Sequence, residues 1–125
     1  MAFEKYISYR AGERGSLSIG ISNLGLLTIN HTLMATYFTP QGFEYCFLYF
    51  DKEKQLIGIQ PCHKEKGTYK ISKHRTGYGQ FHVAALLKLY RVMSKDGRRF
   101  VPTWDEENKM LVIDLNNPVP ARGEE

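Results

Sequence analysis

The chain has 125 residues, of which 42% are hydrophobic and 13% aromatic, so a globular fold is expected rather than a disordered chain. No apolar run reaches the roughly 20 residues that a membrane-spanning helix needs, which excludes such a span. The formal net charge is +4, and the basic excess lies in residues 63–115, with eleven basic and six acidic groups. This excess permits an acidic partner such as nucleic acid, although it could equally serve solubility.

The N-terminal segment and the two cysteines indicate a reducing compartment. Met1-Ala2-Phe3-Glu4-Lys5 lacks the apolar centre of a signal peptide. Cys46 and Cys62 stand alone in the sequence, which is typical of free thiols rather than of a disulfide framework. We therefore expect a cytoplasmic protein.

The first half of the chain is predicted to run strand, turn, strand, helix, strand, turn, strand, after a short strand or arm over residues 3–9. The expected elements are a strand over 17–22, a turn over 23–25, a strand over 26–29, a helix over 31–38 capped by Asn30, an aromatic-rich strand over 43–50, a turn over 51–55 and a strand over 56–59. Thr39-Pro40-Gln41-Gly42 should end the helix.

The same order recurs in the second half. The expected elements are a strand over 68–72, a turn over 73–77, a strand over 78–81, a helix over 81–93, a strand over 99–104 and a strand over 110–115. The strand over 99–104 tolerates Pro102 only at an edge or a bulge, because proline has no N–H to donate. Residues 116–125 are expected to form a flexible tail.

The two halves match each other at nearly constant spacing. Residues 19–22 match residues 69–72 at a spacing of 50, residues 25–29 match residues 77–81 at 52, and Asp51 matches Asp105 at 54. Coincidence is the alternative, since hairpins share turn chemistry. A half of about fifty residues buries little core alone, so two halves are expected to pack about a pseudo-two-fold axis.

We therefore predict one α+β, mainly β domain over residues 1–125, with repeat 1 at about 16–60 and repeat 2 at about 67–115. The ββαββ order of each repeat, carried by residues 21–30, 33–37 and 47–59 in the first, resembles the AbrB/SpoVT/MazE-type swapped-hairpin family. The layout of two units in one chain is similar to the MraZ-like members of that family. The family's basic residue after the turn glycine and its proline at the helix start are not found here.

The resemblance implies a small non-enzymatic DNA-binding transcription regulator or antitoxin-like protein. Its contacts with double-stranded DNA would come from the first hairpin of each unit. In this chain only the first hairpin of the second unit is basic. The predicted nucleic-acid-binding residues are Lys70, Lys73, His74, Arg75, Tyr78, Arg98 and Arg99. Self-association into a homo-oligomer through edge strands is expected as well.

Two alternatives stay open for these residues. The turn at 73–75 could be an ordinary solvated turn, and the pair Arg98-Arg99 could lie on the same face or on another. The whole chain could also be a protein-interaction or assembly module that does not bind nucleic acid.

No motif for catalysis, metal binding or a phosphate-cradling loop is found in the sequence. Cys62-His63 has no partner pair at zinc-ligand spacing, and the acidic run 105–107 falls on a tight turn, where a carboxyl group is solvated. We therefore predict no enzyme activity, no metal, no cofactor and no small-molecule substrate. Five aromatic residues in and beside the strand over 43–50 could stack bases, but most are expected in the core, because alternation turns one set inward: Phe43, Tyr45, Phe47, Tyr49 and Phe50.

Overall fold

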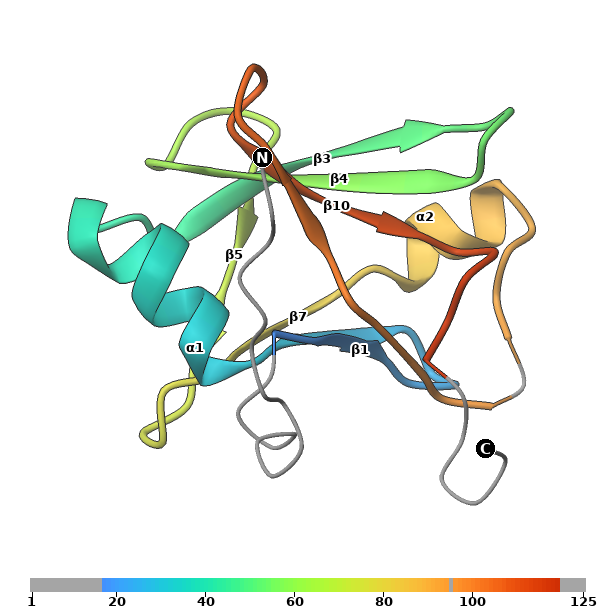
Figure 1. Cartoon of the computed structure of the whole chain (residues 1–125), viewed down its shortest axis with the longest axis horizontal. Helices are drawn as coiled ribbons and strands as arrows, with labels where there is room; N and C mark the ends of the chain where they lie inside the picture. The colour runs from blue at the N-terminus through green and yellow to red at the C-terminus, as the bar shows by residue number, and fades with distance from the viewer. Residues whose placement is uncertain (1–16, 95, 120–125) are drawn as a thin grey trace, which may run out of the picture.

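The computed structural model describes residues 17–94 and 96–119. Within these ranges the fold is α+β and mainly β, with ten strands in two antiparallel sheets and a few short helices (Figure 1). This agrees with the predicted fold class. The arm expected over residues 3–9 and the last part of the expected tail, residues 120–125, lie outside the described residues.

The first half has the predicted order of elements. They are β1 (Ile19–Ile21), β2 (Leu26–Ile29), α1 (His31–Leu33), a π-helical turn (Met34–Phe38), a 3₁₀ turn (Thr39–Gln41), β3 (Tyr45–Asp51) and β4 (Leu56–Cys62). Asn30 caps α1 as predicted, because its side-chain oxygen accepts from the Leu33 N–H at 3.0 Å. Phe38, Met34 and Leu33 turn into the core, and Tyr37 is half-buried.

The second half departs from the prediction in three places. Its elements are β5 (Tyr69–Lys70), β6 (Ser72–Lys73), β7 (Gly79–His82), α2 (Ala84–Leu89), β8 (Arg98–Phe100), β9 (Thr103–Asp105) and β10 (Met110–Asp114). The helix predicted over 81–93 has only six residues. Phe81 is held in β7 opposite Leu27, and Arg91 takes a positive φ of 58° just beyond the helix.

The other two departures are the strands predicted over 68–72 and 99–104, each of which is divided into two shorter strands that belong to different sheets. The sheet that we call sheet A has the order β6-β7-β2-β1-β8, and sheet B has the order β5-β3-β4-β10-β9. The chain passes from β5 to β6 through Ile71, and from β8 to β9 through Val101 and Pro102. Pro102, which has no N–H for a ladder, lies at this corner rather than inside a strand.

These two corners connect the edges of sheet A and sheet B, so that the strands form one closed ring. Each corner strand pairs with sheet A through one part and with sheet B through the other, as β8 does with β1 and β9 with β10. At the second corner β6 pairs with β7, and β5 pairs with β3. Among the described strands, β3 pairs with β5 only through Tyr45 and Cys46, so residues 47–51 form a free edge, and self-association through edge strands stays a prediction.

One core fills the space between the sheets and draws on both halves of the chain. Ile19, Ile29 and Phe38 from the first half and Phe100 and Ile113 from the second are each 0–1% exposed. Helix α1 and helix α2 lie at opposite ends of the two-sheet stack (Figure 1). The described residues thus form a single packed unit, in which neither half has a core of its own.

Two stacked ring pairs connect the halves. Tyr37 of the π-helical turn stacks on Trp104 of β9, with centroids 4.2 Å apart and an interplanar angle of 18°. Tyr90, the residue that ends α2, stacks on Phe50 of β3 at 4.2 Å and 26°. Each helical segment is therefore anchored on a strand from the other half of the chain.

Candidate nucleic-acid interface

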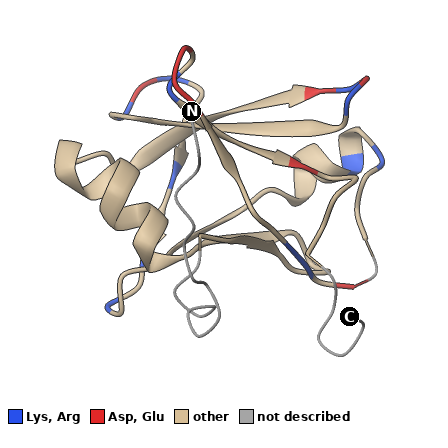
Figure 2. Cartoon of the chain, viewed as in Figure 1, with Lys and Arg blue, Asp and Glu red and all other residues tan. Residues whose placement is uncertain are grey.

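The two sheets differ in charge. The strands of sheet A contain Lys73, Arg98 and Arg99, and no aspartate or glutamate. The strands of sheet B instead contain three aspartates and one lysine: Asp51, Asp105, Asp114 and Lys70. Figure 2 shows basic residues at both ends of sheet A, in the β6–β7 turn and on β8. Only sheet A therefore offers a face that a polyanion would approach without meeting strand carboxylates.

The basic β6–β7 turn is rigid near its base and open at its tip. The His74 N–H donates to the Tyr78 carbonyl at 2.8 Å, and the Gly77 N–H donates to the His74 carbonyl at 2.8 Å. The His74 ring stacks on Tyr78 with centroids 4.4 Å apart and an interplanar angle of 8°. One face of Tyr78 is thus already covered by His74, so this pair positions the turn, and Arg75 projects from its exposed tip.

Lys70 and Lys73, three residues apart in the sequence, belong to different sheets. The Lys73 ammonium lies 3.4 Å from the hydroxyl of Thr39, beside a hollow of about 310 Å³ that Lys70 also lines. The Lys70 ammonium lies over the Tyr45 ring, 5.5 Å from its centroid, on the outward side of sheet B. Lys70 therefore belongs to sheet B and Lys73 to sheet A, although both line the same hollow.

Arg98 and Arg99 point to opposite sides of β8, because successive side chains in a strand alternate. Arg98 is half-buried and its guanidinium lies over the Phe100 ring, 5.5 Å from the centroid. Arg99 is exposed and stands opposite Gly20 of β1. Only Arg99 thus reaches the outward face of sheet A.

A single row of side chains crosses that outward face. The ladders place one residue of each strand in register, and the alternate residues Ile19, Ile29 and Phe81 are buried. The row runs Ser72, Gln80, Thr28, Gly20, Arg99. Gln80 donates to the Thr28 hydroxyl at 3.4 Å, which joins the middle of the row. At about 4.8 Å per strand the row spans about 19 Å.

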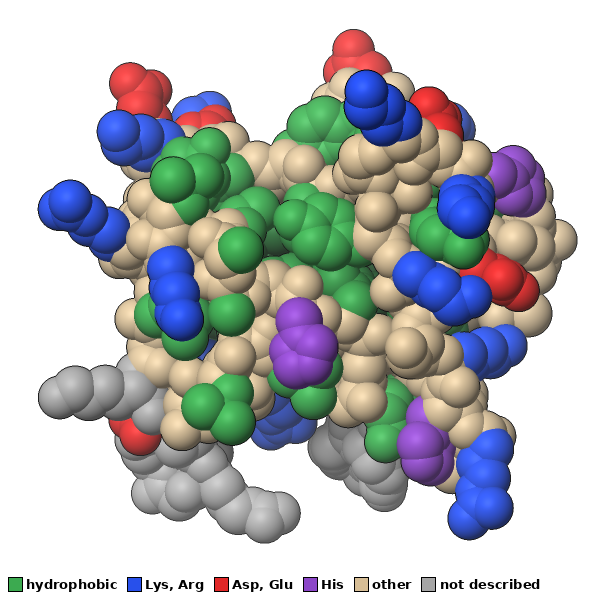
Figure 3. Space-filling model, turned by 180° about the vertical axis from the view of Figure 1, so that it is seen from behind, with side chains coloured by type: hydrophobic (Ala, Val, Ile, Leu, Met, Phe, Trp, Pro, Cys, Tyr) green, Lys and Arg blue, Asp and Glu red, His purple; other side chains and the backbone are tan. Residues whose placement is uncertain are grey.

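The row was not predicted. Each strand's alternation indicates which residues face outward, but the order of five strands drawn from both halves is needed to align them. On the side of the molecule seen in Figure 3, lysine and arginine side chains are spread around the margin and do not form one patch. The interface is therefore defined by strand register.

The aromatic strand also differs from the prediction. Phe43 and Phe50 pack against the core, but Tyr45, Phe47 and Tyr49 alternate with the core residues of β3 and face outward from sheet B. The expectation that most of the five lie in the core was wrong. Alternation is two-fold, so a strand with aromatics at consecutive positions has to place some of them outside.

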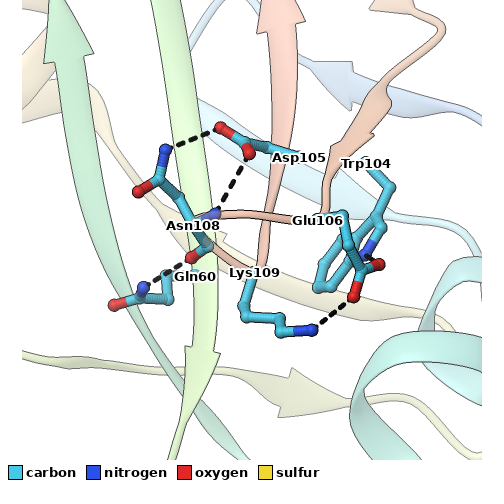
Figure 4. A network of polar contacts seen from close by, with 6 residues as sticks. All are labelled: Gln60, Trp104, Asp105, Glu106, Asn108 and Lys109. Carbon is cyan, nitrogen blue, oxygen red and sulfur yellow. Dashed lines mark hydrogen bonds and ion pairs between the residues drawn. The ribbon is translucent and has the colours of Figure 1, made fainter.

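The acidic β9–β10 turn is held by its own hydrogen bonds (Figure 4). Asp105 accepts from the Asn108 N–H at 3.0 Å and from the Asn108 side chain at 2.8 Å, and these bonds lower the pKa of Asp105. The pKa of Glu106 is lowered by its ion pair with Lys109 and by the Trp104 indole N–H, 2.9 Å away. Both carboxylates therefore remain ionised near neutral pH and are unsuited to donating a proton.

The cysteines are not activated as nucleophiles. Burial raises the pKa of both the Cys46 and the Cys62 thiols, so neither is a thiolate near neutral pH. Among the described residues no three histidine, cysteine or acidic side chains come together as metal ligands would. In the same ranges, no helix has the length and apolar character that crossing a membrane requires.

Comparison of the chain with protein-family models, with curated proteins and with solved structures gives no match. The interpretation of the site consequently depends on its geometry and charge.

Proposed function

We propose that this chain is a non-enzymatic DNA-binding protein, of the transcription-regulator or antitoxin-like kind, that contacts duplex phosphates with the outward face of sheet A. The observation that carries the proposal is the charge division between the sheets: sheet A has cations at both ends and no strand carboxylate. Phosphate neutralisation supplies most of the affinity of proteins for DNA, so a face of this kind favours a duplex and sheet B opposes it.

The dimensions of the face fit this role. The row across sheet A spans about 19 Å. It is therefore long enough to reach across the major groove of B-DNA, which is about 12 Å wide. Arg75 at one edge and Arg99 at the other would therefore reach the phosphates on the two sides of one groove, whereas Lys73 is in register with the buried Gly79 and faces the other side of β6. The neutral middle of the row, Thr28 and Gln80, would face the groove itself.

We also propose that the fold is built from two ββαββ units related by a pseudo-two-fold axis, with their hairpins exchanged. Strand registers support this. Residues that match at a spacing of 52, Thr28 and Gln80, lie directly opposite each other, and so do Gly58 and Val112 at a spacing of 54. An axis of this kind places matching residues face to face, as in an isologous dimer.

Reciprocal contacts between the units support it further. A Cβ built on Gly25 would lie 2.6 Å from the Ala84 Cβ at the start of α2, and a Cβ on the matching Gly77 would lie 3.1 Å from the His31 Cβ at the start of α1. The stacks of Tyr37 on Trp104 and of Tyr90 on Phe50 are a second reciprocal pair. A turn and a strand of each unit thus contact the helical segment of the other unit.

The relation between the units explains why one basic hairpin suffices. The β1–β2 turn has no charged residue, but β8 of the second unit runs beside β1 and adds Arg99 there. The second unit's own turn supplies Arg75 at the other edge. Both ends of the face are therefore basic in one chain, and the homo-oligomer remains a prediction that this site does not require.

The test is fluorescence anisotropy with a random duplex of about 20 base pairs, titrated from about 50 to 200 mM salt. Two phosphate contacts correspond to a log–log salt slope of about −1.8. The double variant Arg75→Ala/Arg99→Ala should lose most of the affinity and flatten the slope toward zero. Lys54→Ala, which removes a cation from the β3–β4 turn, should leave both unchanged.

Two outcomes would count against the proposal. Binding that survives in the double variant would remove sheet A from the interface. Absence of binding at micromolar protein and low salt would favour the alternative of a protein-interaction module without nucleic-acid binding.

A further inference from the structure

The outward face of sheet B is largely apolar, although Gln60, Thr103 and Lys70 also lie on it, and neither helix covers it (Figure 1). Tyr45, Phe47 and Tyr49 face outward from β3, and Tyr49 is 47% exposed. The registers place Gly58 and Val112 beside Tyr49 on the neighbouring strands. Antiparallel sheets commonly leave one face to water, but that face is then polar, so an apolar one indicates a contact surface.

A hollow of about 440 Å³ lies on this face, over Gly58. A Cβ built on Gly58 would lie 2.7 Å from the Met110 sulfur, so the absence of a side chain there allows Met110 to extend across the sheet. Leu56, Val112 and Tyr49 complete the apolar lining. Methionine is flexible and adapts to partners of different shape, which suits a contact surface.

Carboxylates border the hollow at both ends. Asp51 and Asp114 stand on either side of Leu56 in one row of the sheet, and Asp105 stands opposite Met110 in another. Asp114 and Met110 are four residues apart on β10, so the two rows lie about 13 Å apart. Within the part of the chain that the structure describes, no lysine or arginine lines the hollow.

The charge on this face decides which partner fits. The outward aromatics could stack nucleobases, but three carboxylates would repel a polyanion. A second copy docked on the same face by a two-fold axis would place aspartates against aspartates, which is unfavourable as well. A partner with an apolar centre and cationic ends would fill the hollow and pair with the carboxylates at its borders.

We propose that the outward face of sheet B is a docking surface for a basic amphipathic helix of a partner protein. Its apolar stripe would pack on Tyr49, Met110 and Val112, and its lysines or arginines would pair with Asp51 and Asp114 at one end and with Asp105 at the other. Helices are the usual cover of a sheet's apolar face. A separation of about 13 Å corresponds to roughly eight to nine helical residues, and cations about seven to eight apart come close to this length while staying near one face of the helix.

The probe for this surface is a fluorescein-labelled peptide of about 18 residues, made of leucine, alanine and lysine. Its leucines repeat at helical spacing, and lysines flank them about seven to eight residues apart. The full chain should bind it in the micromolar range at low salt. The same peptide with glutamate in place of lysine should not bind.

The matching protein variant is Asp51→Asn/Asp105→Asn/Asp114→Asn. Asparagine keeps the side-chain oxygen that accepts from the N–H groups of Lys54, Asn108 and Asn116, so the turns retain their caps while the charge is removed. Affinity for the peptide should fall at least about tenfold. The control, Glu53→Gln/Glu65→Gln/Glu107→Gln, removes the same charge away from the hollow and should change affinity by less than about twofold.

Four results would overturn the proposal. The first is no peptide binding at about 100 μM, and the second is equal weakening in the control variant, which would indicate unspecific attraction. The third is binding of an oligothymidine that Tyr49→Ala abolishes, which would make the face a base-stacking surface. The fourth is a dimer in solution that Val112→Lys dissociates, which would make a second copy the occupant. This surface lies on the opposite side of the core from sheet A, so failure here and failure of the DNA proposal are distinguishable.

Discussion

At the scale of single residues, two glycines with the same backbone conformation have different surroundings. Gly25 has φ +87° and Gly42 has φ +72°, in the left-handed region that favours glycine. Nothing lies within 4 Å of a Cβ built on Gly42, whereas a Cβ on Gly25 would lie 2.7 Å from the Ala84 Cα. The Gly25 carbonyl also accepts from the Val83 N–H at 2.8 Å, so the turn and the start of α2 are held together.

The pair gives a matched prediction for stability. Gly42→Ala should cost about 1 kcal/mol, which is the strain of a left-handed alanine alone. Gly25→Ala should cost about 3 kcal/mol or more, because backbone atoms on both sides of the contact would have to separate. Urea denaturation of both variants measures the difference, and equal losses would mean that the close approach of the β1–β2 turn to α2 is not important for stability.

At the scale of elements, the short helical segments depend on rings from distant strands. Segments of three to six residues are too short to be stable as isolated helices. Tyr37 and Tyr90 each contact a ring in the other half of the chain, and the buried side chains of Leu33 and Leu87 add the core contacts. The helices are therefore consequences of packing rather than of local propensity.

Double-mutant cycles should detect this dependence. The cycle of Tyr37→Leu with Trp104→Leu, and that of Tyr90→Leu with Phe50→Leu, should each give a coupling energy of about 0.5–1.5 kcal/mol. Unfolding free energies in urea provide the four values for each cycle. A cycle of Tyr37 with Phe50, which make no ring contact with each other, is the control and should give a coupling near zero. Additive losses in the contacting pairs would show that the stacks contribute no specific energy.

At the scale of the whole molecule, the closed ring of strands makes the halves interdependent. The ladders between β2 and β7, between β4 and β10 and between β1 and β8 each join one half to the other. Cutting the chain between the halves would break none of these ladders directly, but a half alone would lack every one of them. A half would then expose its share of the common core to water.

Separately expressed segments should test this interdependence. Residues 1–66 and 67–125 should each be unfolded or self-associated when alone, and equimolar mixing should restore one complex with a cooperative thermal transition. Circular dichroism and size-exclusion chromatography follow both steps. A folded, monomeric segment 1–66 would contradict the shared core.

The regular alternation of apolar residues and the turn chemistry were enough to predict most elements of this chain. The strands over 26–29 and 110–115, the Asn30 cap and the mainly β fold class follow from local pattern, because local pattern reflects which face of an element is buried. The helix over 81–93 was predicted too long, since its periodicity could not reveal that Phe81 pairs with Leu27 and remains in a strand.

The candidate site shows the same limit more sharply. Sequence proximity grouped Lys70 with Lys73 and Arg98 with Arg99. The corner at Ile71 places the two lysines in different sheets, and the alternation of β8 turns the two arginines to opposite sides. The basic turn and Arg99 were identifiable as candidates from residue type alone. Which of them share a face was not, because that depends on strand order, and strand order is set by contacts between residues fifty or more positions apart.

By itself the sequence determined the kinds of element, their order and the amount of charge on the chain. Only the tertiary structure decided that the cations border an acid-free sheet and that the aspartates border an apolar hollow on the other side. The physical reason is that hydrogen-bonding patterns and hydrophobic periodicity act over a few residues, whereas the pairing of whole strands around a common core assigns each side chain to its face.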